Sequence, residues 1–171
     1  MNTEVILVDQ FDNPIETMEK LSAHQSPKLH RAFSIFICHE NKLLIQQRAY
    51  NKYHAGGLWA NTCCSHPKPD EHLSVATQRR LLEEVGINAE LEELFSFIYF
   101  YKFDNGLYEY EYDHVFIGNY NGDVCPNPEE IFKLEWIEAE ELLQDLLVSP
   151  EKYAPWFVAA APRVTQHILK K

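Results

Sequence analysis

Histidine and glutamate side chains from separate segments could together hold a divalent metal ion. His24 and His30 flank a short polar loop, His66 lies in an irregular stretch, and Glu109 and Glu111 alternate in YEYEYD. If that segment is a strand, the two glutamates share one face. Imidazole nitrogens and carboxylate oxygens together suit an ion such as Mn²⁺ or Zn²⁺. Taken one at a time, the histidines could be surface or core residues, and the glutamates could form a solvated acidic face. The metal hypothesis therefore requires that all five residues meet in space.

A cysteine pair beside a histidine, in NTCCSHP, suggests a second chemistry. Cys63, Cys64 and His66 lack the spacer that lets two thiolates chelate one zinc ion, which disfavours a structural zinc site. A thiol in a polar loop beside a histidine can hold a useful thiolate fraction, so a reactive cysteine is expected here. Cys38, inside an apolar run, is expected to be structural. Together with Cys125 the cysteines form no C-x-x-C pair and no regular framework, which indicates reduced thiols.

Arginine and glutamate recur at helical spacing in ATQRRLLEEVG. Arg79 and Glu83 are four residues apart, as are Arg80 and Glu84, so each pair shares a helix face. Surface salt bridges would explain both pairs, although arginine before glutamate is the weaker order for helix stability. Arg80 could instead hold a phosphate while Glu84 binds Mg²⁺, because Mg²⁺ usually takes one or two carboxylates together with phosphate oxygens.

Hydrophobic patterning predicts the elements that position these side chains. Strands are expected at 4–9, in two hairpins at 31–49 and 94–118, and at 131–138. Helices are expected at 17–24, at 70–86 with Asp70 as N-terminal cap and Gly86 at the end, at 139–147 and from Pro155 onward. Residues 50–69 lose all periodicity, as functional loops often do. Strands interleaved with a few helices predict an α/β or α+β sandwich.

Size and charge limit the class of protein. A chain of 171 residues with 46% hydrophobic residues can bury one core, so a single domain over 1–171 is expected. A formal net charge of −11 disfavours nucleic acid or an anionic membrane as a partner. No apolar run reaches the ~20 residues of a membrane span, and the expected compartment is the cytoplasm. The choice between monomer and homodimer stays open.

The stretch SHPKPDEHLSVATQRRLLEEVGI, about residues 65–87, resembles a Nudix box. Ser65 replaces the first glycine of that motif, and Arg80 replaces a glutamate that contributes to metal binding in diphosphate-hydrolysing members. These departures, with NTCCSHP, LHRAFS and YEYE in the same order, resemble the type 1 isopentenyl-diphosphate isomerase family over nearly the whole chain. The resemblance implies a Nudix-type α/β/α sandwich with a mixed sheet.

The same resemblance implies a reaction and its partners. A metal-dependent isomerase of this kind converts isopentenyl diphosphate, a small-molecule substrate, to dimethylallyl diphosphate in isoprenoid precursor biosynthesis. A proton is added to the terminal alkene carbon and another is removed from C2, by way of a tertiary carbocation. The implied cofactors are Mg²⁺, arriving with the diphosphate, and Mn²⁺ or Zn²⁺, or again Mg²⁺, at the histidine and glutamate site.

The resemblance also implies a role for each matching residue. The catalytic set is Cys64, Glu111, Tyr99 as the hydrogen-bonding partner of Glu111, and Trp156 over the reacting carbons. The diphosphate-binding set is Arg48, Lys52 and Arg80. The metal ligands are His24, His30, His66, Glu109 and Glu111 at one site and Glu84 at the Mg²⁺ site. Whether Cys64 or Glu111 delivers the first proton stays open.

Two other functions fit parts of the pattern. A Nudix diphosphate hydrolase would use the same scaffold, but Arg80 at a metal-binding glutamate position argues against it. A non-catalytic metal-binding or interaction module would explain the histidines and glutamates. It would leave Cys64, Arg48 and Lys52 without a purpose.

Overall fold

The computed structural model describes residues 3–170. Residues 1, 2 and 171, which the expected domain bounds of 1–171 include, lie outside the described residues. In chain order the elements are β1 (Glu4–Val8), β2 (Pro14–Glu19), α1 (Lys20–Gln25), β3 (His30–His39), β4 (Lys42–Arg48), β5 (Trp59–Ala60), β6 (Cys63–Ser65), α2 (Leu73–Val85), β7 (Leu91–Lys102), β8 (Tyr108–Asn119), β9 (Ile131–Glu138), α3 (Ala139–Val148), the 3₁₀ helix η1 (Pro150–Lys152) and α4 (Pro155–Leu169).

Within the described chain, nine strands form one mixed sheet around β3. Strand β3 pairs in parallel with β8 along its length, from His30 opposite Glu111 to Cys38 opposite Asn119. Its other edge pairs antiparallel first with β6 and then with β4. The run AFSIFIC is apolar because β3 is buried on both faces. This central strand brings the segments of His30, Cys64 and Glu111 side by side.

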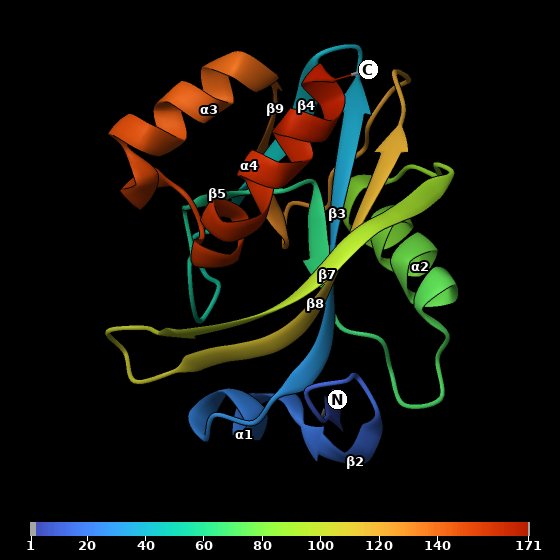
Figure 1. Ribbon diagram of the computed structural model, residues 1–171, viewed down its shortest axis with the longest axis vertical. Helices are drawn as coiled ribbons and strands as arrows, with labels where there is room; N and C mark the ends of the chain where they lie inside the picture. The colour runs from blue at the N-terminus through green and yellow to red at the C-terminus, as the bar shows by residue number, and fades with distance from the viewer. Residues whose placement is uncertain (1–2, 171) are drawn as a thin grey trace.

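Helices cover both faces of the sheet, as Figure 1 shows. Helix α2 packs Ala76, Leu81 and Val85 against one face. Helices α3 and α4 cover the other face, where Phe36 of β3 stacks on Phe157 of α4. These two cores confirm the predicted α/β/α sandwich with a mixed sheet.

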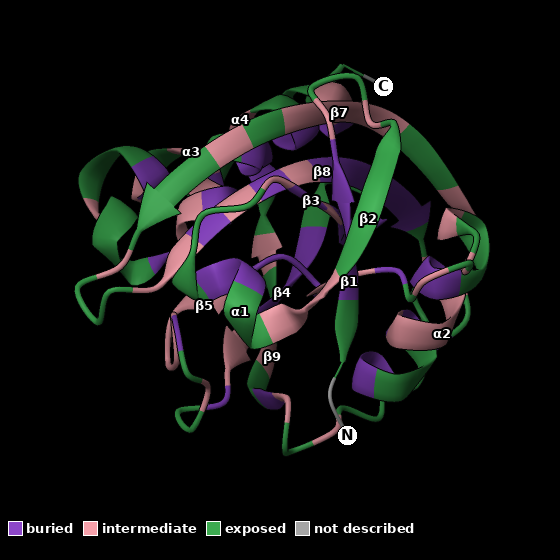
Figure 2. Cartoon of the chain, turned by 90° about the horizontal axis from the view of Figure 1, so that it is seen from below, coloured by how far each residue is buried: buried purple, intermediate pink, exposed green. Residues whose placement is uncertain are grey.

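The hairpin of β7 and β8 crosses the sheet and extends beyond it (Figure 1). Its register places Tyr99 opposite Glu111, and the predicted turn D-N-G closes it with Gly106 at a φ of 81°. In the first half of β8 burial alternates, with Glu109, Glu111 and Asp113 buried, and the strand is then buried continuously to Gly118. Strand β7 is half-buried or exposed (Figure 2). One face of this hairpin therefore closes over the interior of the protein.

No helix among residues 3–170 is long and apolar enough to span a membrane.

Three local predictions were wrong. The helix expected at 17–24 begins at Lys20, because residues 14–19 form β2 and pair with β1. His72, not Asp70, is the N-cap of α2: its side chain accepts from the Ser74 N–H, while Asp70 lies in a turn with a φ of 62°. The stretch expected to be irregular contains the short strands β5 and β6. Gly86 ends α2 in the left-handed conformation, as predicted.

Candidate active site

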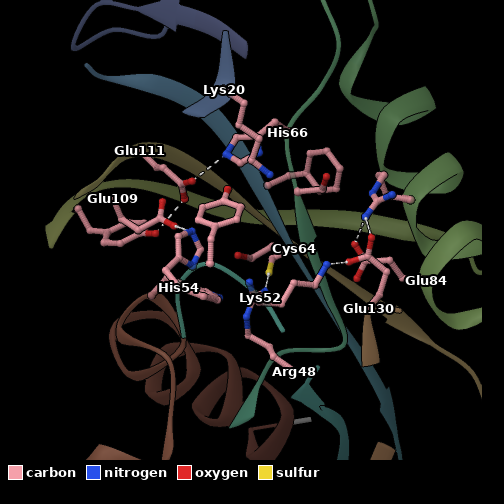
Figure 3. Close-up of a pocket in the computed structure, with 17 residues that line it drawn as sticks. Lys20, Arg48, Lys52, His54, Cys64, His66, Glu84, Glu109, Glu111 and Glu130 are labelled. Carbon is pink, nitrogen blue, oxygen red and sulfur yellow. Dashed lines mark hydrogen bonds and ion pairs between the residues drawn. The ribbon is translucent and has the colours of Figure 1, made fainter. Parts of the chain in front are cut away.

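A pocket opens where the β7–β8 hairpin faces β6, α2 and the start of α4 (Figure 3). Most of the residues singled out from the sequence line it: Arg48, Lys52, Cys64, His66, Arg80, Glu84, Tyr99, Glu109, Glu111 and Trp156. The remaining two, His24 of α1 and His30 of β3, are fully buried beside His66, with ring centroids 5.0 to 5.9 Å apart. The fold therefore gathers the whole predicted set in one region.

Two of the histidines are oriented by backbone carbonyls. His24 Nδ1 lies 2.8 Å from the Tyr108 carbonyl oxygen, and His30 Nδ1 lies 2.8 Å from that of Lys28. Each carbonyl can only accept, so Nδ1 carries the proton and Nε2 presents a lone pair. Among the described residues, both Nε2 atoms are buried without a hydrogen-bond partner. A backbone acceptor behind a free imidazole nitrogen is the arrangement found behind metal-binding histidines.

Burial keeps His24 and His66 neutral. It lowers the pKa of His24 to about 4 and the pKa of His66 to about 3. Only a neutral imidazole can bind a metal, so the rings are ready to act as ligands near neutral pH. The ligand atoms of His24, His30, His66 and Glu111 lie within 4.8 Å of one another.

The two hairpin glutamates are both buried, so a solvated acidic face is excluded. Burial opposes ionisation of Glu111, but the imidazoles of His30 and His66, whose Nε2 atoms lie 3.4 and 2.8 Å from its Oε1, outweigh it and hold its pKa well below the ordinary range. Burial and the neighbouring Glu111 charge raise the pKa of Glu109 well above that range. A cation would offset this repulsion, and Glu109 Oε2 has no hydrogen-bond partner in the described chain. The donor set therefore fits a divalent ion.

Glu109 belongs to an adjoining group of possible ligands. It lies with His24 and His54, whose ligand atoms are also within 4.8 Å of one another. His24 is common to both groups. The five predicted ligands thus occupy two overlapping groups, and His54 is an additional member.

Cys64 occupies β6, opposite Ser34 of β3, and its thiol faces the pocket (Figure 3). The prediction that Cys64 lies in a polar loop and holds a useful thiolate fraction is wrong. The residue lies on a strand, and burial raises its pKa to about 12. Arg48 counteracts this partly, with Nη1 3.7 Å from Sγ. The thiol is therefore protonated at neutral pH. Cys63 is fully buried in the core beneath α2.

Tyr99 and Trp156 enclose the reactive end of the pocket. Tyr99 donates a hydrogen bond of 2.9 Å from its hydroxyl to Glu111 Oε2. The Trp156 indole N–H donates to Asn61 Oδ1 at 3.1 Å, which fixes the ring, and Arg48 lies 5.1 Å from its centroid. Trp156 is buried, and its ring borders both the core and the pocket.

The opposite end of the pocket carries cations and carboxylates. Arg80 forms an ion pair with the buried Glu84, and Glu130 pairs with Lys52 and lies 3.5 Å from Arg80 Nη2. Of the two pairs proposed from helical spacing, Arg79 and Glu83 form a partly exposed salt bridge that Glu71 extends. Arg80 and Glu84 instead face the pocket. There the guanidinium could bind a diphosphate and the carboxylate could bind its Mg²⁺.

Among the residues that line the pocket, sequence reasoning missed the charged Lys20 and Glu130 and the histidine His54. Lys20 was placed within a helix that begins only there. His54 lies in the aperiodic stretch already singled out for function, so the composition of that stretch was an available signal. Glu130 stands in a loop, and nothing in its spacing distinguishes it.

The fold and the pocket together define a class of protein. A model of the NUDIX domain matches residues 28–157. The fold is similar to that of DR0079 from Deinococcus radiodurans, with a TM-score of 0.78 over 94% of this chain and 98% of that one, at 17% identity. It is also similar to a MutT NUDIX hydrolase from Burkholderia pseudomallei, with a TM-score of 0.65 over 80% and 98% of the two chains, at 19% identity. At such low identity these structures show the fold alone: a Nudix domain.

Closer relatives narrow the class. The chain is 48% identical to "Isopentenyl-diphosphate Delta-isomerase 2" of Aromatoleum aromaticum over 96% of this chain and 87% of that protein. It is 42% identical to "Isopentenyl-diphosphate Delta-isomerase" of Burkholderia multivorans over 100% and 98%. The chain therefore belongs to the isopentenyl-diphosphate Delta-isomerase family of the Nudix superfamily.

Proposed function

We propose that this chain converts isopentenyl diphosphate to dimethylallyl diphosphate by shifting a proton, without releasing phosphate. The observation that carries the proposal is the pairing, in one pocket, of a group that carries a proton with a group that can accept one. Cys64 supplies a neutral thiol, and Glu111, bonded to Tyr99, supplies an ionised carboxylate. Both line the same cavity as the cations at its other end.

The reaction requires one proton gained and one lost. A proton added to the terminal alkene carbon leaves a tertiary cation, and removal of a proton from C2 forms the new double bond. Two groups on opposite sides of the alkene, one donor and one acceptor, satisfy this balance. Cys64 on β6 and Glu111 on β8 come from strands on opposite edges of β3. We assign these two residues to the proton transfers.

The cation must be stabilised and kept from water. The indole of Trp156 lines the pocket, and an aromatic face stabilises a desolvated cation by about 2 kcal/mol. The ionised Glu111 adds a fixed negative charge in a site largely removed from solvent. An intermediate in this pocket would therefore lose its proton faster than it captures water.

Metal ions have two places in this proposal. His24, His30, His66, Glu109 and Glu111 would hold one ion, which supplies positive charge that fixes Glu111 and offsets the repulsion between the two carboxylates. Glu84 would bind the Mg²⁺ that accompanies the diphosphate. Arg48, Lys52 and Arg80 orient the diphosphate group so that the alkene lies between Cys64 and Glu111. These assignments rest on the donor atoms and on the cavity that they share.

A direct assay tests the proposal. Purified protein is incubated with isopentenyl diphosphate and Mg²⁺, with Mn²⁺ or Zn²⁺ added in parallel, and both dimethylallyl diphosphate and free phosphate are measured. We expect the isomer without phosphate, and loss of activity on chelation. Phosphate without isomer would instead identify a diphosphate hydrolase.

Variants test the assigned residues. Cys64→Ala and Glu111→Gln should each lower turnover by at least about 10²- to 10⁴-fold, the contribution of a positioned acid or base. Cys125→Ala, at an exposed cysteine outside the pocket, is the matched control and should keep full activity. A Cys64→Ala rate close to that of the unmodified protein would refute the mechanism.

A further inference from the structure

His54 is a buried histidine to which the proposed reaction gives no role. It lies in the segment between β4 and β5 and contacts Glu109 of β8, with its Nε2 atom 2.5 Å from Glu109 Oε1. The side chains are only 7% and 3% exposed. At this distance the nitrogen and oxygen must share a proton, because two facing lone pairs would repel. The contact is therefore directional and shielded from water.

Aromatic neighbours fix the His54 ring. It stacks on Phe103 with an interplanar angle of 3° and a centroid separation of 5.0 Å. The edges of Tyr53 and Trp156 meet it at 4.5 and 5.9 Å. A ring held on three sides cannot swing away from Glu109, so His54 is built to hold that carboxylate in one orientation.

The orientation leaves one glutamate oxygen free. With Oε1 engaged by His54, Oε2 of Glu109 is buried and, among the described residues, has no hydrogen-bond partner. It lies 3.7 Å from Nδ1 of His24, on the imidazole whose Nε2 is free, and His24 is common to both groups of possible metal ligands. A partner that binds one oxygen of a carboxylate and directs the other at a metal is a recurrent means of raising metal affinity.

We propose that His54 is a positioning residue for the metal site, holding Oε1 of Glu109 so that Oε2 is presented to the ion. The inference rests on the proposed role of Glu109 as a ligand. Direct ligation by His54 is the alternative, since its ring nitrogens are close enough to the group. The Nε2 atom, however, already shares a proton with Oε1 and cannot also give its lone pair to a metal. Direct ligation would therefore have to use Nδ1, which is buried without a hydrogen-bond partner among the described residues.

The test is metal affinity, measured without substrate. Mn²⁺ is titrated into metal-free protein, and free Mn²⁺ is followed by its electron paramagnetic resonance signal. His54→Ala should weaken Mn²⁺ binding by about 10- to 100-fold, and His54→Gln, which keeps an N–H donor, should recover part of the loss. His39→Gln, at a half-buried histidine that contacts Trp136, is the matched control and should bind like the unmodified protein.

A double variant distinguishes loss of the positioning role of His54 from general damage to the fold. In a Glu109→Gln protein, adding His54→Ala should cause little further loss of affinity, because the two residues act as one unit. Independent, additive losses would overturn the proposal. Unchanged Mn²⁺ affinity in His54→Ala would also overturn it, whereas failure of the unmodified protein to bind Mn²⁺ would overturn the metal site itself.

The absorption spectrum of the Co²⁺-loaded protein distinguishes positioning from ligation. The energies of the d–d bands follow the ligand set. They should stay the same in His54→Ala at saturating Co²⁺ if His54 only orients Glu109. A shift like that caused by loss of a nitrogen ligand in His24→Ala would show that His54 binds the ion itself and would contradict the proposal.

Discussion

Cys64 and Glu111 share a pocket but are driven to opposite protonation states. Burial acts against charge at both residues and prevails only at Cys64, whose pKa rises to about 12. At Glu111, the adjacent imidazoles of His30 and His66 reverse the effect of burial and keep the carboxylate ionised. One side of the pocket therefore stores a proton while the other can accept one. A reaction that adds one proton and removes another needs this asymmetry.

The raised pKa of Cys64 predicts slow alkylation. Only the thiolate reacts with iodoacetamide, and a thiol with a pKa of about 12 is protonated at pH 8. In metal-free protein at pH 8, Cys125, which is exposed, should be modified well before Cys64. The Cys64 rate should rise as the pH approaches 12. Peptide mass spectrometry measures both rates, with unfolded protein as the control in which the two cysteines react alike; equal rates in the folded protein would contradict the prediction.

Glu130 neutralises cations that a diphosphate would need. It pairs with Lys52 and lies close to Arg80, and these partners are partly shielded from solvent. Without Mg²⁺, Glu130→Gln should bind pyrophosphate roughly two- to fivefold more tightly, since such a pair contributes up to about 1 kcal/mol. Calorimetric titration tests this, with Glu138→Gln as the control, because that carboxylate pairs with the exposed Lys42 instead. Weaker binding by Glu130→Gln would show that Glu130 helps to hold the anion.

The elements that sequence patterns predicted are those with a long, regular apolar period. Strands β3, β4 and β8 and helices α3 and α4 were predicted because burial imposes that period. Strand β2 was missed since PIETME is mostly exposed and owes its conformation to pairing with β1. The short strands β5 and β6 depend likewise on partners distant in sequence. Local pattern carries no information about such partners.

The candidate site divides in the same way. Residues within motifs, such as Cys64 in NTCCSHP and Glu84 in the Nudix-like box, could be identified from the chain. His54 and Glu130 could not, because their importance comes from contacts with Glu109 and Lys52 on other elements. A motif is recognised from residue types and their spacing along the chain, whereas these contacts exist only once the sheet has formed.

Helix α2 depends on its terminal glycine. Gly86 has a φ of +75°, and a Cβ atom there would lie 2.8 Å from both Cβ and the carbonyl oxygen of Cys125. Gly86→Ala should therefore lower the free energy of unfolding by about 1–3 kcal/mol, which urea denaturation measures. Gly106→Ala is the control, since its φ is +81° but no atom lies within 4 Å of the added Cβ. Equal losses in the two variants would mean that the contact with Cys125 does not matter.

Charge must be organised locally because the whole molecule repels anions. The net charge is −11, yet the substrate of the proposed reaction carries a diphosphate. Lys20, Arg48, Lys52 and Arg80 all line the one pocket. The pocket also contains carboxylates, so these cations, together with the divalent ions that the carboxylates would hold, give a local attraction that the overall field does not supply. The site can therefore select a small diphosphate while the surface still disfavours large polyanions.

Metal binding should stabilise the whole molecule, because the proposed ligands come from segments far apart in the chain. His24 is on α1, His66 follows β6, and Glu109 and Glu111 are on β8. An ion that binds only the folded protein adds about 2.7 kcal/mol at 100 times its dissociation constant. Thermal unfolding of metal-free protein should therefore shift to higher temperature with Mn²⁺ or Zn²⁺ and return on chelation.

The ligand variants decide whether that shift comes from the proposed site. His24→Ala removes a ligand whose Nε2 is free, and Glu109→Gln removes a charge whose repulsion by Glu111 the ion would offset. Both should reduce the shift caused by Mn²⁺. Glu109→Gln should nevertheless raise the midpoint of the metal-free protein at neutral pH, because folding no longer has to bury or protonate a carboxylate that is ionised in the unfolded chain. His39→Gln should keep the full shift. If all variants gained as much from Mn²⁺ as the unmodified protein, the ion would bind elsewhere, and the buried histidines and glutamates would need another explanation.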